Sequence, residues 1–262
     1  MDEMHKLEDS ISKNIELVKQ KIDIAALSAG RSSFEVNLVV VSKGQPDDVI
    51  RAAITAGVKT FGENYPEEAI KKIQTLGGHP GIEWHMIGHL QSRKARIVAE
   101  NFSVFHSLDS VHLAMKLDKI LNEQNRKMPV MLECNVSQED TKYGWPAWDE
   151  DQWQSLLADV SAILKCKCLV LVGLMTMPPL FQNIEATRPY FRKLFSLKEY
   201  LSKEISGEYF KELSMGTSID YPIAIQEGAT FIRIGQAILG PHPYYRHVDE
   251  SVSNVSAFKL DK

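Results

Sequence analysis

The chain has 262 residues, of which 44% are hydrophobic, and this is enough to bury a full core as one domain. The net charge of -4 and the isoelectric point near 6.1 argue against a nucleic-acid-binding protein, whose binding face is normally basic. No apolar run approaches the roughly 20 residues of a membrane span, and the acidic, polar N-terminal stretch lacks the apolar centre of a signal peptide.

The three cysteines, Cys134, Cys166 and Cys168, point to a reducing compartment, because an odd count gives no framework of paired disulfides. Cys166 and Cys168 are separated by one residue, which is the wrong spacing for a Cys-x-x-Cys redox or zinc motif. The sequence also shows no cluster of metal-ligating side chains. We therefore expect a cytoplasmic protein without a metal site.

Residues 5–28 carry apolar side chains at intervals of three and four, and Gly30 then provides a glycine signal for the end of a helix. Charged residues occupy the other face. This spacing predicts an amphipathic N-terminal helix within residues 1–30, packed against the outside of the main body.

From residue 31 onward, strand-like and helical patterns alternate. Apolar runs predict eight strands at about 36–42, 59–62, 83–88, 103–108, 129–136, 168–176, 210–215 and 230–236. Helical spacing predicts helices between them at about 46–57, 66–76, 92–100, 110–125, 149–164, 185–204 and 219–227. This alternation predicts an α/β fold, a closed (β/α)8 barrel over residues 31–262 with a C-terminal tail. An open doubly wound sheet is the runner-up, but no Gly-x-Gly-x-x-Gly motif follows the first strand.

Lys43 follows the apolar run 38–41 after one serine, and Gly44 and Pro46 then end that strand. The carboxyl ends of parallel barrel strands are where such folds place their chemistry, and a lysine amine there can act as a nucleophile. The alternative is a solvated lysine that only caps the strand.

The loops after the last two predicted strands carry candidates for binding phosphate, as they often do in such barrels. Ser214 offers a hydroxyl, Gly216 allows close approach of the backbone, and Gly235 and Gln236 present successive backbone N–H groups. Together with Lys43, these residues favour a ligand that carries both a phosphate and a carbonyl group.

Two further charged residues have open roles. Strand alternation places Arg233 on the same face as Gly235, where it is either a salt-bridge partner or a donor to a ring nitrogen or an acid.

Lys142 follows the fifth predicted strand, in a loop that Gly144 allows to fold over the barrel opening. It is either a second amine that accepts the ligand from Lys43 or a solvated loop lysine.

Several stretches in this order resemble the pyridoxal phosphate homeostasis protein family (YggS/PROSC-like), single-domain relatives of the alanine racemase N-terminal barrel. The resemblance covers about residues 36–240, nearly the whole barrel. The matching stretches are VSKGQP, FGENYPEEA, EWHMIGHLQSRKAR, SLDS, DTKYG, GLMTM, LSMGTSID and IRIGQAILG.

The resemblance implies a fold type III site for pyridoxal 5'-phosphate (PLP). It assigns Lys43 to an internal aldimine, Asn64 to a place beside the cofactor, Arg233 to the pyridine nitrogen, and Ser214, Gly235 and Gln236 to the phosphate. The family commonly has threonine where Gln236 stands and methionine where Thr217 stands. The glutamine at position 236 thus removes one hydroxyl donor to the phosphate, and Thr217 offers a hydroxyl nearby.

An arginine beside the ring nitrogen leaves that nitrogen unprotonated, so the ring is a weak electron sink. A racemase of this type needs a second acid–base residue, a tyrosine from an additional domain, whereas here Tyr244 and Tyr245 lie in a short tail. We therefore assign no catalytic residue and expect a PLP-binding protein of intracellular PLP homeostasis without robust turnover.

We expect this protein to be a monomer that serves apo PLP-dependent enzymes. The alternatives left open are a PLP-dependent amino-acid racemase-like enzyme, an aldolase in which Lys43 attacks a sugar phosphate, and a regulatory module that binds another protein.

Overall fold

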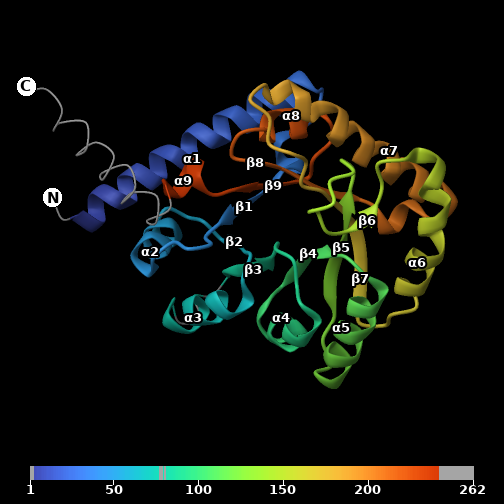
Figure 1. The fold of residues 1–262 in the computed structure, drawn as a ribbon. Coiled ribbons are helices and arrows are strands. Elements are labelled where there is room, and N and C mark those ends of the chain that lie inside the picture. The colour runs from blue at the N-terminus through green and yellow to red at the C-terminus, as the bar shows by residue number, and fades with distance from the viewer. Residues whose placement is uncertain (1–2, 77–78, 80, 242–262) are drawn as a thin grey trace, which may run out of the picture.

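The computed structural model describes residues 3–76, 79 and 81–241 of the chain. Eight parallel strands close into a barrel with helices around it (Figure 1). Neighbouring strands follow the order β4-β3-β2-β1-β9-β8-β7-β5, and a pairing of β4 with β5 closes the ring. The strands are β1 (Asn37–Val41), β2 (Thr60–Glu63), β3 (Glu83–Met86), β4 (Val104–Leu108), β5 (Met128–Asn135), β7 (Leu169–Met175), β8 (Glu212–Thr217) and β9 (Phe231–Ile234).

The predicted (β/α)8 barrel is confirmed, since every predicted strand and helix overlaps an observed one. Helix α5 begins at a capping residue, since Ser110 accepts a hydrogen bond from the backbone N–H of Leu113. The helices are α1 (Glu3–Ser28), α2 (Asp47–Thr55), α3 (Pro66–Leu76), α4 (Ala95–Asn101), α5 (Val111–Glu123), α6 (Leu156–Ile163), α7 (Arg188–Glu204), α8 (Tyr221–Gln226) and α9 (Gln236–Leu239).

Two short elements were not predicted. The two-residue strand β6 (Trp145–Pro146) pairs with the end of β5, and it is too short for a pattern to reveal. The four-residue helix α9 follows directly on Gly235, where the sequence indicates a turn. Neither element changes the architecture.

The N-terminal helix α1 lies across the outside of the barrel, against α2, α8 and α9 (Figure 1). Its buried residues include Ile11, Ile15, Val18 and Ile22, which is the predicted apolar stripe. Asn14 Nδ2 donates a hydrogen bond of 3.0 Å to the carbonyl oxygen of Ile238 in α9. The extra helix is therefore confirmed, while the domain boundary at residue 30 stays a prediction.

Side chains of the strands alternate between the outer core and the barrel interior. Val40 and Ile232 belong to the hydrophobic cluster packed beneath the helices, whereas their neighbours Val39 and Arg233 do not, although both are buried. No helix among the described residues has both the length and the apolar character needed to cross a membrane.

Candidate functional site

Lys43 lies at the mouth of the barrel, in the turn that follows β1. Its side chain is exposed, and Gly44 after it has a positive φ of 63°, which favours glycine. Strands β1 and β2 pair with Val41 opposite Gly62. The same register, carried past the strand ends, sets Lys43 level with Asn64. The candidate nucleophile and its predicted neighbour therefore share the mouth.

A buried ionic cluster holds this turn from below. Lys72 Nζ donates hydrogen bonds to the carbonyl oxygen of Ser42 (2.6 Å) and to the Oε1 atoms of Glu63 (2.7 Å) and Glu68 (2.5 Å). The same Glu68 oxygen accepts a bond of 2.5 Å from the backbone N–H of Gly44. Burial raises the pKa of the Glu63 carboxyl, against the opposing effect of Lys72. The cluster ties α3 to the turn that carries the candidate nucleophile.

Asn64 offers an unused polar atom to a ligand. Its Oδ1 is buried and has no hydrogen-bond partner among the described residues. A side chain at Gly88 would place its Cβ 2.5 Å from the Asn64 carbonyl oxygen, so only glycine allows this close contact. A hollow of about 360 Å³ opens here, lined by Asn64, Tyr65, Pro66, Gly88, His89, Gln91, Lys94 and Tyr143.

Arg233 is buried inside the barrel. Its Nη1 donates a hydrogen bond of 2.6 Å to Ser214 Oγ, and its Nη2 donates one of 2.9 Å to the carbonyl oxygen of Thr176. Burial lowers the pKa of Arg233 to about 10, with Asp220 and Glu133 opposing, so the guanidinium remains charged at pH 7. These two bonds use two of its five N–H donors and fix the plane of the group.

Ser214, predicted to bind phosphate, lies in the barrel interior. Its hydroxyl oxygen is 2.6 Å from Arg233 Nη1 and 2.8 Å from His106 Nδ1, and His106 Nε2 is 3.0 Å from His85 Nδ1. The Ser214 hydroxyl is thus already engaged within the protein. Its role in phosphate binding stays a prediction.

The corner predicted to bind phosphate contains a hydroxyl residue that the sequence reasoning did not single out. Ser218, just beyond the end of β8, accepts a hydrogen bond of 3.2 Å at Oγ from the backbone N–H of Gly235. Gln236 follows with an exposed side chain. Its position in the chain could have revealed it, because Ser218 is the first residue with a hydroxyl group after the end of β8, whereas Ser214 lies within that strand.

Thr217 and Lys142 make contacts within the protein. The Thr217 hydroxyl donates a bond of 3.0 Å to Asp220 Oδ1, so it does not offer a spare donor to phosphate in this arrangement. Lys142 Nζ lies 3.4 Å from the carbonyl oxygen of Pro178 and 3.7 Å from Glu139 Oε2. Its side chain is one quarter exposed, so its amine is held only by long contacts.

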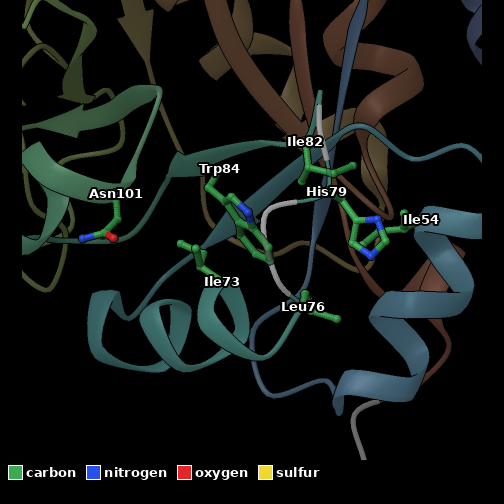
Figure 2. Close-up of a pocket in the computed structure, with 7 residues that line it drawn as sticks. All are labelled: Ile54, Ile73, Leu76, His79, Ile82, Trp84 and Asn101. Carbon is green, nitrogen blue, oxygen red and sulfur yellow. The ribbon is translucent and has the colours of Figure 1, made fainter.

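A separate hollow of about 220 Å³ lies at the other end of the barrel (Figure 2). It is framed by the last turns of α2, α3 and α4 and the start of β3, away from Lys43. Its lining is mostly apolar, and we assign no ligand to it. The lining residues are Ile54, Ile73, Leu76, His79, Ile82, Trp84 and Asn101.

The fold and the mouth define a class of protein, a (β/α)8 barrel that presents one lysine amine beside a buried arginine and a glycine-lined corner. The family described as "Alanine racemase, N-terminal domain" matches residues 9–243, and the chain belongs to it. An alanine racemase of Clostridium difficile shares the fold with a TM-score of 0.63 and 15% sequence identity. That match covers 90% of this chain and 57% of the racemase.

Within this class, the chain belongs to the pyridoxal phosphate homeostasis proteins. Proteins with that name from Haemophilus influenzae and Escherichia coli strain K12 are 36% and 34% identical to it. Both matches cover 90% of this chain and 97% and 98% of those proteins. PipY of Synechococcus elongatus, solved with PLP bound, is 36% identical, with a TM-score of 0.71 over 79% of this chain and 93% of PipY.

Proposed function

We propose that this protein binds PLP reversibly at the barrel mouth and acts in intracellular PLP homeostasis, with Lys43 as the covalent anchor. The observation that carries the proposal is the meeting of three groups at the ends of the adjacent strands β8, β9 and β1. These are the exposed Lys43 amine, the charged Arg233 guanidinium and the Ser218–Gly235 corner. Membership of the homeostasis family and the PLP-bound structure of PipY support it.

The residues of the mouth suit this ligand. When bound, PLP supplies an aldehyde that condenses with primary amines, and Lys43 provides such an amine. Gln236 offers a backbone N–H group to the phosphate, and the backbone N–H of Gly235 would do so by exchanging its present partner, Ser218 Oγ. The unused Oδ1 of Asn64 gives a polar contact beside it, so the donors and acceptors of the site fit the cofactor.

Arg233 favours retention of the cofactor over turnover. A guanidinium with a pKa of about 10 donates hydrogen bonds and gives no proton to a pyridine nitrogen near pH 7. The ring then draws electrons weakly, as expected for a carrier. The racemase alternative requires a second acid–base group, and its candidates Tyr244 and Tyr245 lie outside the described residues. A cytoplasmic location, a monomeric state and apo PLP-dependent enzymes as recipients belong to the same proposal.

The test is the absorption spectrum of the Lys43→Ala variant mixed with PLP. Wild type is expected to show a visible band of lysine-bound PLP that borohydride removes, and Lys43→Ala is expected to lack it. Unfolding stability should change by less than about 1 kcal/mol, because the side chain is exposed. Lys59→Ala is the matched control, an exposed lysine before β2 at the other end of the barrel. A Lys43→Ala protein that keeps the band would contradict the proposal.

A further inference from the structure

Glu133 is a half-buried acid in the barrel that neither the sequence reasoning nor the proposed function uses. It lies on β5 between Leu132 and Cys134, which both belong to the hydrophobic cluster beneath the helices. Alternation along the strand therefore turns Glu133 toward the barrel interior. Its Oε2 is buried and has no hydrogen-bond partner among the described residues. A buried carboxylate oxygen without a partner is costly, so this atom needs either a proton or a ligand donor.

The loop after β5 shields Glu133 from water. Gly144 has a φ of 98°, and a Cβ built on it would lie 2.9 Å from Glu133 Cγ. The backbone at Gly144 therefore rests directly on the acidic side chain, and a larger residue would displace it. This is the loop that carries Lys142, so the lysine proposed to receive the ligand and the half-buried acid share one wall of the mouth.

The charges around Glu133 come from several elements. Asp109 follows β4 and accepts a bond of 2.9 Å from His89 Nδ1, Lys142 lies in the covering loop, and Arg233 extends from β9. Burial, followed by the charge of Asp109, raises the pKa of the Glu133 carboxyl to about 7, while Arg233 and Lys142 oppose the shift. Near neutral pH the ligand-free protein therefore contains both the acid and the carboxylate form.

We propose that Glu133 carries a proton when PLP is bound, and that binding of PLP takes this proton up from solvent. The inference rests on the proposed function, because it needs an anionic ligand in the mouth. PLP bound at the mouth would add the negative charge of its phosphate and its ring oxygen to the charges that Glu133 faces, which disfavours the carboxylate. The carboxylate would then gain one proton from water, and the resulting O–H would be available as a hydrogen-bond donor.

Binding and protonation are therefore linked in a direction that can be measured. Below pH 7 the carboxyl is already protonated, and PLP binds without further proton uptake at this residue. Above pH 7 each binding event must also protonate Glu133, so affinity falls as the pH rises. If each PLP that binds brings one proton onto Glu133, the titration of this residue alone increases the dissociation constant of PLP about tenfold per pH unit.

The experiment compares the dissociation constants of PLP for wild type and Glu133→Gln by equilibrium dialysis between pH 6 and pH 9. Glutamine keeps the shape of the side chain and stays neutral, while the titrations of PLP itself are common to both proteins. The ratio of the wild-type constant to the Glu133→Gln constant is expected to grow by up to about tenfold per pH unit above pH 7. Asp140→Asn, an exposed acid in the same loop, is the matched control and should follow wild type.

Calorimetry gives a second readout. Binding at pH 8, measured in two buffers that lack a primary amine and differ in ionisation enthalpy, should show more proton uptake in wild type than in Glu133→Gln. Parallel pH curves and equal proton uptake in two proteins that both bind PLP would overturn this inference alone. Absence of PLP binding in wild type would overturn the proposed function and this inference with it.

Discussion

At the scale of single residues, the barrel interior contains a chain of hydrogen bonds whose direction Arg233 fixes. An arginine only donates, so Ser214 Oγ accepts from it and turns its own O–H toward His106 Nδ1. His106 must then carry its proton on Nε2, which donates to His85 Nδ1. Both imidazoles are neutral in this arrangement. Burial also favours the neutral form of both rings, since burial lowers the pKa of His85 to about 4 and that of His106 well below its usual value.

This chain predicts a loss of stability in acid. The unfolded chain takes up protons on histidine below about pH 6.5, whereas folded His85 resists protonation down to about pH 4. The free energy of unfolding therefore has its full value with respect to His85 above pH 6.5 and decreases as the pH falls from 6.5 toward 4. His85 alone should lower it by about 2 kcal/mol between pH 6.5 and pH 5. Urea unfolding at both pH values checks this.

The control for this measurement is the variant His85→Gln, which cannot take up the proton. Over the same pH interval, the free energy of unfolding of this variant should decrease by about 2 kcal/mol less than that of wild type. The groups facing His85, namely Glu83 and His106, stay in place in both proteins. An equal loss in the two proteins would show that His85 is not the titrating group.

Single residues were only partly predictable from the sequence. Lys43 and Arg233 stand out from strand ends and alternation, whereas the place of Asn64 beside a cofactor comes only from the family resemblance, and the roles of all three stay predictions. Ser218 was missed because choosing it over Ser214 depends on where β8 ends, a boundary that patterns give only to within a few residues. Glu133 was missed because one acid within an apolar strand gives no indication of what covers it.

At the scale of elements, the cluster around Lys72 joins α3 to the turn after β1. Lys72 and Glu63 are both buried, and Glu68 completes the cluster. A lysine on the buried face of a helix is unusual unless it is paired, and its pairing here positions the turn rather than the ligand. The cluster explains why a turn with an exposed tip keeps a defined shape.

Replacement of Lys72 by methionine should therefore destabilise the protein strongly. Without its partner, Glu63 becomes an uncompensated buried charge, which costs about 3–5 kcal/mol. The double variant Lys72→Met/Glu63→Gln removes both charges and should recover a large part of this loss. Urea unfolding of the three proteins gives the comparison. A double variant as unstable as Lys72→Met would show that the ion pair is not the cause.

The elements themselves were largely readable from the sequence, because each barrel strand is an apolar run and each long helix has an apolar face. β5 and β7 show this well, with bounds that differ from the predicted ranges by one residue at each end. The ionic cluster could not be predicted, since its members come from β2 and α3 and only the folded structure brings them together.

At the scale of the whole molecule, the proposed function requires that the protein pass its ligand to another protein. Lys142 lies on the mouth face with a partly exposed side chain and only long contacts at Nζ. We expect Lys142→Ala to slow the transfer of PLP to an apo-enzyme several-fold, while the visible band at Lys43 stays unchanged. The measurement is the rate at which an apo PLP enzyme regains activity when mixed with each loaded protein.

Lys59→Ala serves again as the control, because it removes an exposed lysine from the opposite end of the barrel. It should transfer PLP at the wild-type rate. Equal rates for wild type and Lys142→Ala would leave Lys142 as an ordinary loop residue, and they would not affect the role of Lys43.

The pairing of β1 with β9 also sets when a binding site first exists. Val39 lies opposite Arg233, so the strands that carry the proposed anchor Lys43 and the proposed ring-facing Arg233 are neighbours in space, although the two residues are about 190 residues apart in sequence. A ribosome adding about 5–20 residues per second needs roughly 10–40 seconds to make the intervening chain. During that time Lys43 has been synthesised but Arg233 and Gly235 have not. The proposed site is therefore complete only after the last strand has been synthesised, and we expect full retention of the cofactor only from then on.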